Sequence, residues 1–168
     1  MKDEELEKSL ARVHEWIRSV DQKISIALVL EAGVLVILMK PTYTFFMRLH
    51  PSPGVLVVVL LVATMVLFGA AMLKAVIALA PRLRPPKSTK SVLYFGSIAT
   101  MELKAFSRKV KRAKKDDYAT DLIQQIHVSS VISQRKHQAL ADSLYLMLAA
   151  LIPWLVALVI MWARIYAN

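Results

Sequence analysis

The chain contains no cysteine among its 168 residues, and it has only four histidines. The absence of cysteine excludes disulfides, thiolate catalysis and cysteine-ligated zinc, and it leaves the redox compartment undetermined. Of the histidines, only His127 and His137 lie close enough in the sequence to share a helix. Ten residues at about 1.5 Å of rise each would separate them by about 15 Å, which is too far for one metal ion. We therefore expect no metal site.

Catalytic motifs are also lacking. The sequence has no nucleophile elbow, no glycine-rich phosphate loop and no HExxH motif. Asp117 and Asp121 are spaced as a carboxylate pair on a helix, but an amphipathic helix explains that spacing equally well. We expect that the protein is not an enzyme and that it needs no cofactor.

Apolar sequence is abundant, since hydrophobic residues make up 57% of the chain. Residues 54–80 carry a single charge, Lys74. A helix of that length would measure about 40 Å, more than the ~30 Å of a bilayer's hydrocarbon core. A buried helix of a soluble protein would need a surrounding core, which the rest of this short chain does not offer. Residues 54–80 are therefore predicted to span a membrane.

Two further apolar segments, residues 20–39 and 143–166, are predicted to be the first and third spans. Pro41 is expected to end the first span, and Pro153 is expected to kink the third. Residues 40–53 would form an external connector. The predicted fold class is an all-α integral membrane protein: a helical bundle with about three transmembrane helices and a helical, basic cytoplasmic region.

The basic region comprises residues 81–142, which hold thirteen Lys or Arg and five Asp or Glu, a net +8 of the chain's +10. By the positive-inside rule this region and the N-terminus are cytoplasmic, and three spans place the C-terminus outside. Clustered basic residues near anionic lipid contribute roughly 1 kcal/mol each, so residues 108–115 favour a lipid surface. No aromatic residue is interleaved there to stack on bases, and we expect no nucleic-acid partner.

Residues 1–23 are predicted to form an amphipathic cytoplasmic helix. Its apolar residues recur at alternating steps of four and three, which makes one stripe along the helix. This stripe packs either on the chain itself or on another subunit, and a homo-oligomer is expected. The stripe continues into the first span: Leu6, Leu10, Val13, Ile17, Val20, Ile24, Ala27, Glu31, Val34 and Leu38.

Glu31 and Lys74 are predicted to form an ion pair inside the membrane. Counted from Lys23 and from Pro81, both lie roughly 10–12 Å inside the same face. Intramembrane ionisable residues are costly and are functional candidates by default. Two other interpretations remain open: Lys74 extends alone to the interface, and Glu31 is a protonated acid hydrogen-bonded within the bundle.

Polar and aromatic residues of the basic region suit a small anionic ligand that carries a ring. Each of them taken singly is more often structural than functional. The candidate binding residues are Tyr94, Phe95, Gly96, Ser97, Tyr118, Asp121, Gln125, His127, Ser130 and Lys136.

Short groups of residues along nearly the whole chain carry a family resemblance. In chain order they are Trp16, Asp21 and Lys23, then Pro81-Arg82-Leu83, then Ser91-Val92-Leu93-Tyr94-Phe95-Gly96, and then Tyr118, Asp121-Leu122-Ile123, Gln125-Ile126-His127, Ser130 and Lys136-His137. This succession resembles the transmembrane effector family of Pycsar antiphage systems.

The resemblance implies a multi-pass effector in the bacterial inner membrane that acts in abortive infection. Its ligand would be a cyclic pyrimidine mononucleotide, cyclic CMP or cyclic UMP, and its activation would impair the membrane. The competing interpretation is a non-enzymatic membrane scaffold, or an adaptor that binds anionic lipid without a nucleotide ligand.

Overall fold

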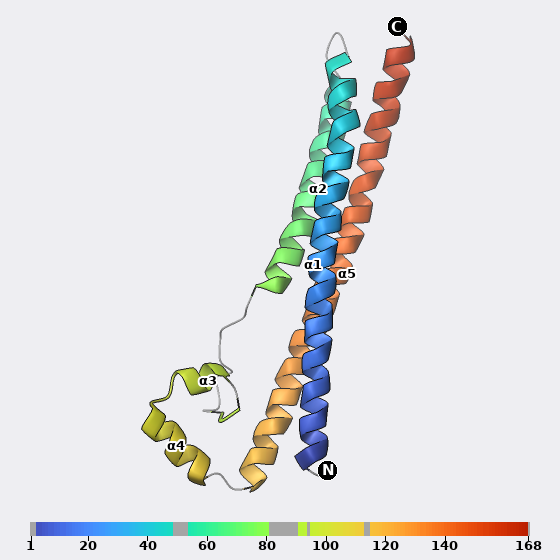
Figure 1. The fold of residues 1–168 in the computed structure, drawn as a ribbon. Helices are drawn as coiled ribbons and strands as arrows, with labels where there is room; N and C mark the ends of the chain where they lie inside the picture. Colours follow the sequence, from blue (N-terminus) through green and yellow to red (C-terminus); the bar gives the residue numbers. More distant parts are fainter. Residues whose placement is uncertain (1–2, 49–53, 81–90, 94, 113–114, 168) are drawn as a thin grey trace. The chain divides into compact units, whose positions relative to one another are not determined.

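The computed structural model describes residues 3–48, 54–80, 91–93, 95–112 and 115–167. These residues contain no strand and five helices: α1 (Asp3–Arg48), α2 (Val55–Leu79), α3 (Phe95–Ala99), α4 (Leu103–Arg112) and α5 (Lys115–Ala167) (Figure 1). The predicted all-α fold class is confirmed.

The chain divides into two compact units. The basic unit comprises Met1–Val20 and Ala80–Lys136, and the membrane unit comprises Asp21–Leu79 and His137–Asn168. Helices α1 and α5 each contribute residues to both units.

The predicted stripe of α1 is confirmed within each unit. Wherever the structure describes the side chains of α1, every buried one belongs to that stripe. The basic unit holds Leu6, Val13 and Val20, and the membrane unit holds Ile24, Ala27, Glu31 and Leu38. Residues three, four and seven apart share one face of a helix, so the sequence pattern alone determines which face of α1 is covered.

The membrane unit is built from parts of α1 and α5 together with α2 (Figure 1). Phe68 of α2 packs in one cluster with Leu38 of α1 and Ala150 of α5, and Val57 of α2 packs in another with Ala157 and Met161 of α5. On the remaining length of α2 the buried residues are small, including Ala71, Ala75 and Ala78. Small residues let helix backbones approach closely, as is typical of membrane bundles.

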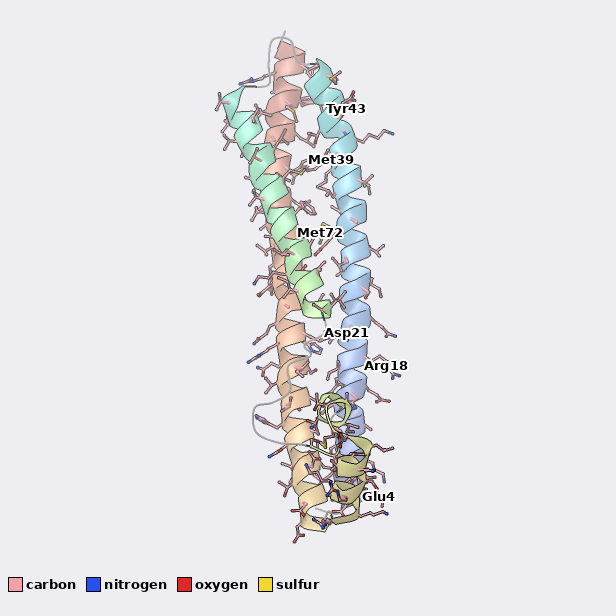
Figure 2. The ribbon with its side chains drawn as sticks, turned by 90° about the vertical axis from the view of Figure 1, so that its left-hand side faces the viewer. Glu4, Arg18, Asp21, Met39, Tyr43 and Met72 are labelled. Atoms are coloured by element: carbon pink, nitrogen blue, oxygen red, sulfur yellow. The ribbon has the colours of Figure 1, made fainter. Side chains whose placement is uncertain are left out.

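The outward side of the membrane unit is apolar, which reverses the pattern of a water-soluble bundle. Val36 of α1 is 70% exposed and Ile152 of α5 is 66% exposed. Met39 and Tyr43 of α1 are exposed as well (Figure 2). Among the described residues, three helices are long and apolar enough to cross a membrane. The chain is therefore a multi-pass membrane protein whose exposed apolar surface suits a lipid bilayer.

Helix α1 extends beyond the predicted end of the first span. Pro41 was expected to end the first span, but α1 continues through it to Arg48. Proline removes one backbone donor, and hydroxyl groups nearby commonly compensate in membrane helices. Here the Thr42 and Thr44 hydroxyls donate to the carbonyls of Leu38 and Lys40, at 2.7 and 3.0 Å. Side-chain hydrogen bonds thus accompany the backbone ladder around the proline.

The basic unit contains α3, α4 and the first part of α5. Leu122, Ser129 and Ser133 are the buried residues of α5 there. Helices α3 and α4 are separated by a turn, in which Met101 donates its N–H to the carbonyl of Ile98 at 3.1 Å. Helix α4 buries none of its residues.

The close packing of α2 gives a testable prediction. Ala75 is fully covered, so Ala75→Leu should overpack the membrane unit and lower the free energy of unfolding by about 1–3 kcal/mol. Thermal unfolding in detergent measures this effect. Val76 is half exposed, so Val76→Leu is the matched control and should leave the midpoint unchanged. Equal midpoints for both variants would contradict the packing.

Candidate functional site

Asp121 organises a group of hydrogen bonds in the basic unit. Its Oδ2 accepts from the Ser91 hydroxyl at 2.8 Å and from the Val92 N–H at 3.0 Å. The Ser91 oxygen in turn accepts from the Leu93 N–H at 3.0 Å and from the Gln125 amide at 3.4 Å. We name Ser91, Val92, Leu93, Asp121 and Gln125 the Asp121 cluster. Asp121 and Gln125 lie one turn apart on α5, so a single helix face holds residues 91–93 against it.

The second oxygen of Asp121 is a possible point of attachment for a ligand. Asp121 Oδ1 is buried and accepts no hydrogen bond from the part of the chain that the structure describes. Buried polar atoms nearly always have a partner, and a carboxylate oxygen can only accept. The cluster therefore offers an acceptor that suits an N–H or O–H donor from outside the chain.

Tyr118 lies one turn before Asp121 on α5 and binds α1 rather than the cluster. Its hydroxyl donates to Glu7 Oε1 at 2.8 Å. This hydrogen bond to Glu7 is the largest cause that raises the pKa of the Tyr118 phenol above its ordinary value of 10.0. Desolvation and the negative charges of Glu7, Asp3 and Asp121 raise this pKa further. Glu7 was not among the predicted site residues, because a contact across 111 positions leaves no trace in the local pattern.

The other predicted ligand residues are not gathered at one place. Nine residues at about 100° each turn His127 to the face of α5 opposite Tyr118, whereas Lys136, eighteen residues on, returns to the face of Tyr118. The Ser130 hydroxyl donates to its own helix, at the carbonyl of Ile126. Of these six residues on α5, Asp121 and Gln125 are the two that meet in the Asp121 cluster.

The predicted segment from Tyr94 to Ser97 is described only in part. Tyr94 and the side chain of Phe95 lie outside the described residues. Gly96 and Ser97 belong to α3, where Ser97 is buried and its carbonyl accepts from the Thr100 hydroxyl at 3.0 Å. Ser91, just before this segment, was not among the candidate binding residues, and its hydrogen bond to Asp121 was not predicted.

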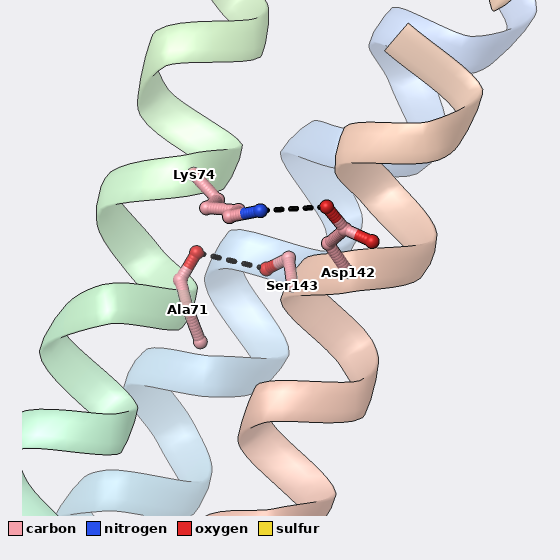
Figure 3. Close-up of polar contacts among 4 residues, drawn as sticks. All are labelled: Ala71, Lys74, Asp142 and Ser143. Carbon is pink, nitrogen blue, oxygen red and sulfur yellow. Dashed lines mark hydrogen bonds and ion pairs between the residues drawn. The ribbon is translucent and has the colours of Figure 1, made fainter. Parts of the chain in front are cut away.

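A second polar site lies in the membrane unit, and it corrects the predicted ion pair. Lys74 Nζ donates to Asp142 Oδ2 of α5 at 2.6 Å, so its carboxylate partner is Asp142 and not Glu31 (Figure 3). Both side chains are about half exposed. Asp142 directly precedes residue 143, where the predicted third span begins. A partner at that end of the span agrees with the predicted depth of Lys74 in the membrane. The prediction considered only the neighbouring span and therefore missed it.

Glu31 has a different partner. It is fully buried, and its Oε1 lies 2.5 Å from the hydroxyl oxygen of Ser143 on α5. The same hydroxyl lies 2.9 Å from the carbonyl oxygen of Ala71 on α2 (Figure 3). Three helices thus meet at one hydroxyl group. Glu31 was correctly predicted to face the protein interior, whereas Ser143 was named only as the start of a span.

The contact between Tyr118 and Glu7 predicts a pH dependence. The folded-state pKa of Tyr118 is raised, so the stabilisation by this hydrogen bond is complete below pH ~10. It is lost as the pH rises through the folded-state pKa. The phenolate absorbance of the native chain minus that of Tyr118→Phe isolates this titration from the other tyrosines. Its midpoint should lie above 10.0 and should fall in Glu7→Gln. A midpoint at or below 10.0 would contradict the hydrogen bond.

Comparison with known proteins gives one match. The model of the Pycsar effector protein domain matches residues 5–163, which include α2–α4 entirely and nearly all of α1 and α5. No curated protein and no solved structure matches the chain. The match agrees with the three membrane-spanning helices and with the resemblance drawn from short motifs. The chain belongs to the Pycsar effector protein domain family and is a membrane effector of an antiphage system.

Proposed function

We propose that the effector is activated by a cyclic pyrimidine mononucleotide, cyclic CMP or cyclic UMP, which binds in the basic unit. Activation changes the membrane unit so that the bacterial inner membrane is impaired and the infected cell dies. Family membership supports the role of membrane effector. The ligand is what the family resemblance implies.

The observation that carries the proposal is the buried Asp121 Oδ1, which accepts no hydrogen bond from any described residue. Cytosine and uracil both have N–H groups on the edge of the base, and a carboxylate oxygen is a good acceptor for them. Gln125 lies one turn away and adds an amide to the same region. The net charge of +8 over residues 81–142 favours the approach of the cyclic phosphate.

Transmission uses the continuity of α5. Asp121 and Gln125 of the Asp121 cluster lie on the same helix as the third span, Lys115–Ala167. A ligand shifts a conformational equilibrium only when it binds the two states with different affinity. In the proposed mechanism the nucleotide stabilises an arrangement of residues 91–93 on α5 that differs from the resting one.

We also propose a homo-oligomer, since Trp16 is an exposed aromatic residue on the amphipathic part of α1.

Calorimetry of the detergent-purified chain tests the ligand. Cyclic CMP or cyclic UMP should bind saturably, and cyclic AMP and cyclic GMP should bind more weakly or not at all. Gln125→Ala should weaken the affinity about tenfold, which corresponds to ~1.4 kcal/mol and to the loss of one buried hydrogen bond. Gln124→Ala is the matched control, because Gln124 is the exposed neighbour. Its affinity should equal that of the native chain.

A second candidate function is favoured by α4. Lys104, Arg108, Lys109, Lys111 and Arg112 lie on a helix that buries none of its residues, as expected of a surface that binds anionic lipid. A lipid-binding adaptor would show no saturable binding of any cyclic mononucleotide in the calorimeter. Saturable pyrimidine nucleotide binding that Gln125→Ala leaves unchanged would move the ligand site away from the Asp121 cluster.

The proposed orientation has its own test. The positive charge of residues 81–142 places this region and the N-terminus in the cytoplasm, so the end of the third span lies in the periplasm. Alkaline phosphatase fused after Asn168 should therefore be active. The control fusion after Ala80, which follows two spans, should be inactive. An inactive enzyme after Asn168 would overturn the orientation or the third span.

A further inference from the structure

The polar site around Ser143 is short of one hydrogen atom when Glu31 is ionised. The Ser143 hydroxyl has a single hydrogen and two neighbouring oxygens, Glu31 Oε1 at 2.5 Å and the Ala71 carbonyl oxygen at 2.9 Å. An ionised carboxylate and a carbonyl can only accept. One hydrogen cannot be directed at both oxygens with good geometry, so one short contact would bring two lone pairs together.

We infer that Glu31 is a proton-binding site and that its side chain is a neutral carboxylic acid in the state described. The acid O–H donates from Oε1 to the Ser143 oxygen, and the Ser143 O–H donates to the Ala71 carbonyl. Each hydrogen then has one acceptor. This hydrogen-bond chain joins α1, α5 and α2, and the proton on Glu31 is its first link.

The other oxygen of Glu31 agrees with this assignment. Glu31 Oε2 is buried and accepts no hydrogen bond from the described residues. Burying an ionised carboxylate without partners costs far more than burying a neutral carbonyl oxygen. Protonation turns Oε2 into the carbonyl oxygen of a neutral acid, whose lack of a donor is tolerated.

The charged groups that face this region do not supply a counter-ion. From α2 the charge is Lys74 and from α5 it is Asp142, and these two bind each other at 2.6 Å. Glu31 is itself the one ionisable residue in residues 24–39 of α1. The positive charge of Lys74 is thus committed to another carboxylate, which leaves protonation as the way to neutralise Glu31.

A small metal ion does not fit in place of the proton. Separations of 2.5 and 2.9 Å between oxygens are those of O–H···O hydrogen bonds. Two adjacent oxygen ligands of Mg²⁺, each at about 2.0–2.1 Å in octahedral geometry, lie about 2.9 Å apart. The 2.5 Å between Glu31 Oε1 and the Ser143 oxygen is therefore too short for two oxygens that share such an ion. The described groups also include no cluster of acidic and histidine side chains that could hold a metal.

Infrared spectroscopy of the purified chain at neutral pH tests the proton directly. A neutral carboxyl group has a C=O stretching band that a carboxylate lacks, and this band shifts in heavy water. The infrared spectrum of the native chain minus that of Glu31→Gln should contain such a band. The matched control, Asp142→Asn, should remove only carboxylate bands. Carboxylate bands alone in the Glu31→Gln difference would overturn the inference.

Two further measurements distinguish a proton on Glu31 from a bound cation and test the hydrogen-bond chain. Replacing sodium by choline in the buffer should leave the Glu31 band unchanged, and a sodium-dependent carboxylate band would overturn the inference in favour of a bound cation. Glu31→Gln retains an N–H donor toward Ser143, so its midpoint of thermal unfolding should match the native value. Ser143→Ala breaks the chain and should lower the midpoint. If Glu31→Gln lowered the midpoint of thermal unfolding as much as Ser143→Ala, the inference of a protonated Glu31 would also be overturned.

Discussion

The hydrocarbon interior of a bilayer offers no hydrogen-bond partner, and every polar group that enters it must find one within the protein. Most polar groups of the membrane unit meet this constraint, and Glu31 Oε2 is an exception among the described residues. Its backbone is helical, and the hydroxyls of Thr42 and Thr64 donate to carbonyls one turn earlier in their own helices. Trp154 donates its ring N–H to the Thr42 oxygen at 3.0 Å, which joins α5 to α1. Lys74 and Asp142 form an ion pair, in which each neutralises the charge of the other.

Close packing and polar contact depend on each other at the centre of this unit. The Ser143 hydroxyl is short, so it reaches the Ala71 carbonyl only where α2 and α5 approach closely. The small side chains of Ala71 and Ala75 permit that approach. A large residue at either position would therefore remove a hydrogen bond as well as disturb packing. This dependence explains why small and polar residues occupy neighbouring buried positions in such an apolar unit.

Sequence periodicity predicted the elements and their buried faces better than the partners of individual side chains. The stripe of α1 followed from spacing because a helix has a fixed number of residues per turn. The partner of Lys74 did not follow, because it depends on how α2 and α5 are rotated about their axes. The same limit applies to Asp121, which was named as a candidate binding residue. Its partner Ser91 is thirty residues away, and no local pattern connects them.

Pro41 shows a different limit of sequence reasoning. Proline is a strong helix terminator in water, where the freed carbonyl and the bent chain both find solvent. Within a membrane, ending a helix exposes several backbone groups, whereas continuing through proline leaves out a single hydrogen bond. The balance therefore favours continuation wherever neighbouring side chains help. Pro41 cannot donate to the carbonyl of Ile37, and the hydroxyls of Thr42 and Thr44 add hydrogen bonds to the nearby carbonyls of Leu38 and Lys40.

In the proposed mechanism, helix α5 couples ligand sensing to the response within one element. It carries Asp121, whose Oδ1 accepts no hydrogen bond from the described residues, and Ser143, whose hydroxyl joins three helices. Hydrogen bonds lose strength steeply as their geometry departs from linear. A modest rotation of α5 would therefore turn Ser143 away from both Glu31 and Ala71 at once. The membrane unit would lose its central polar contact as one event, which is the discrete behaviour that a two-state effector requires.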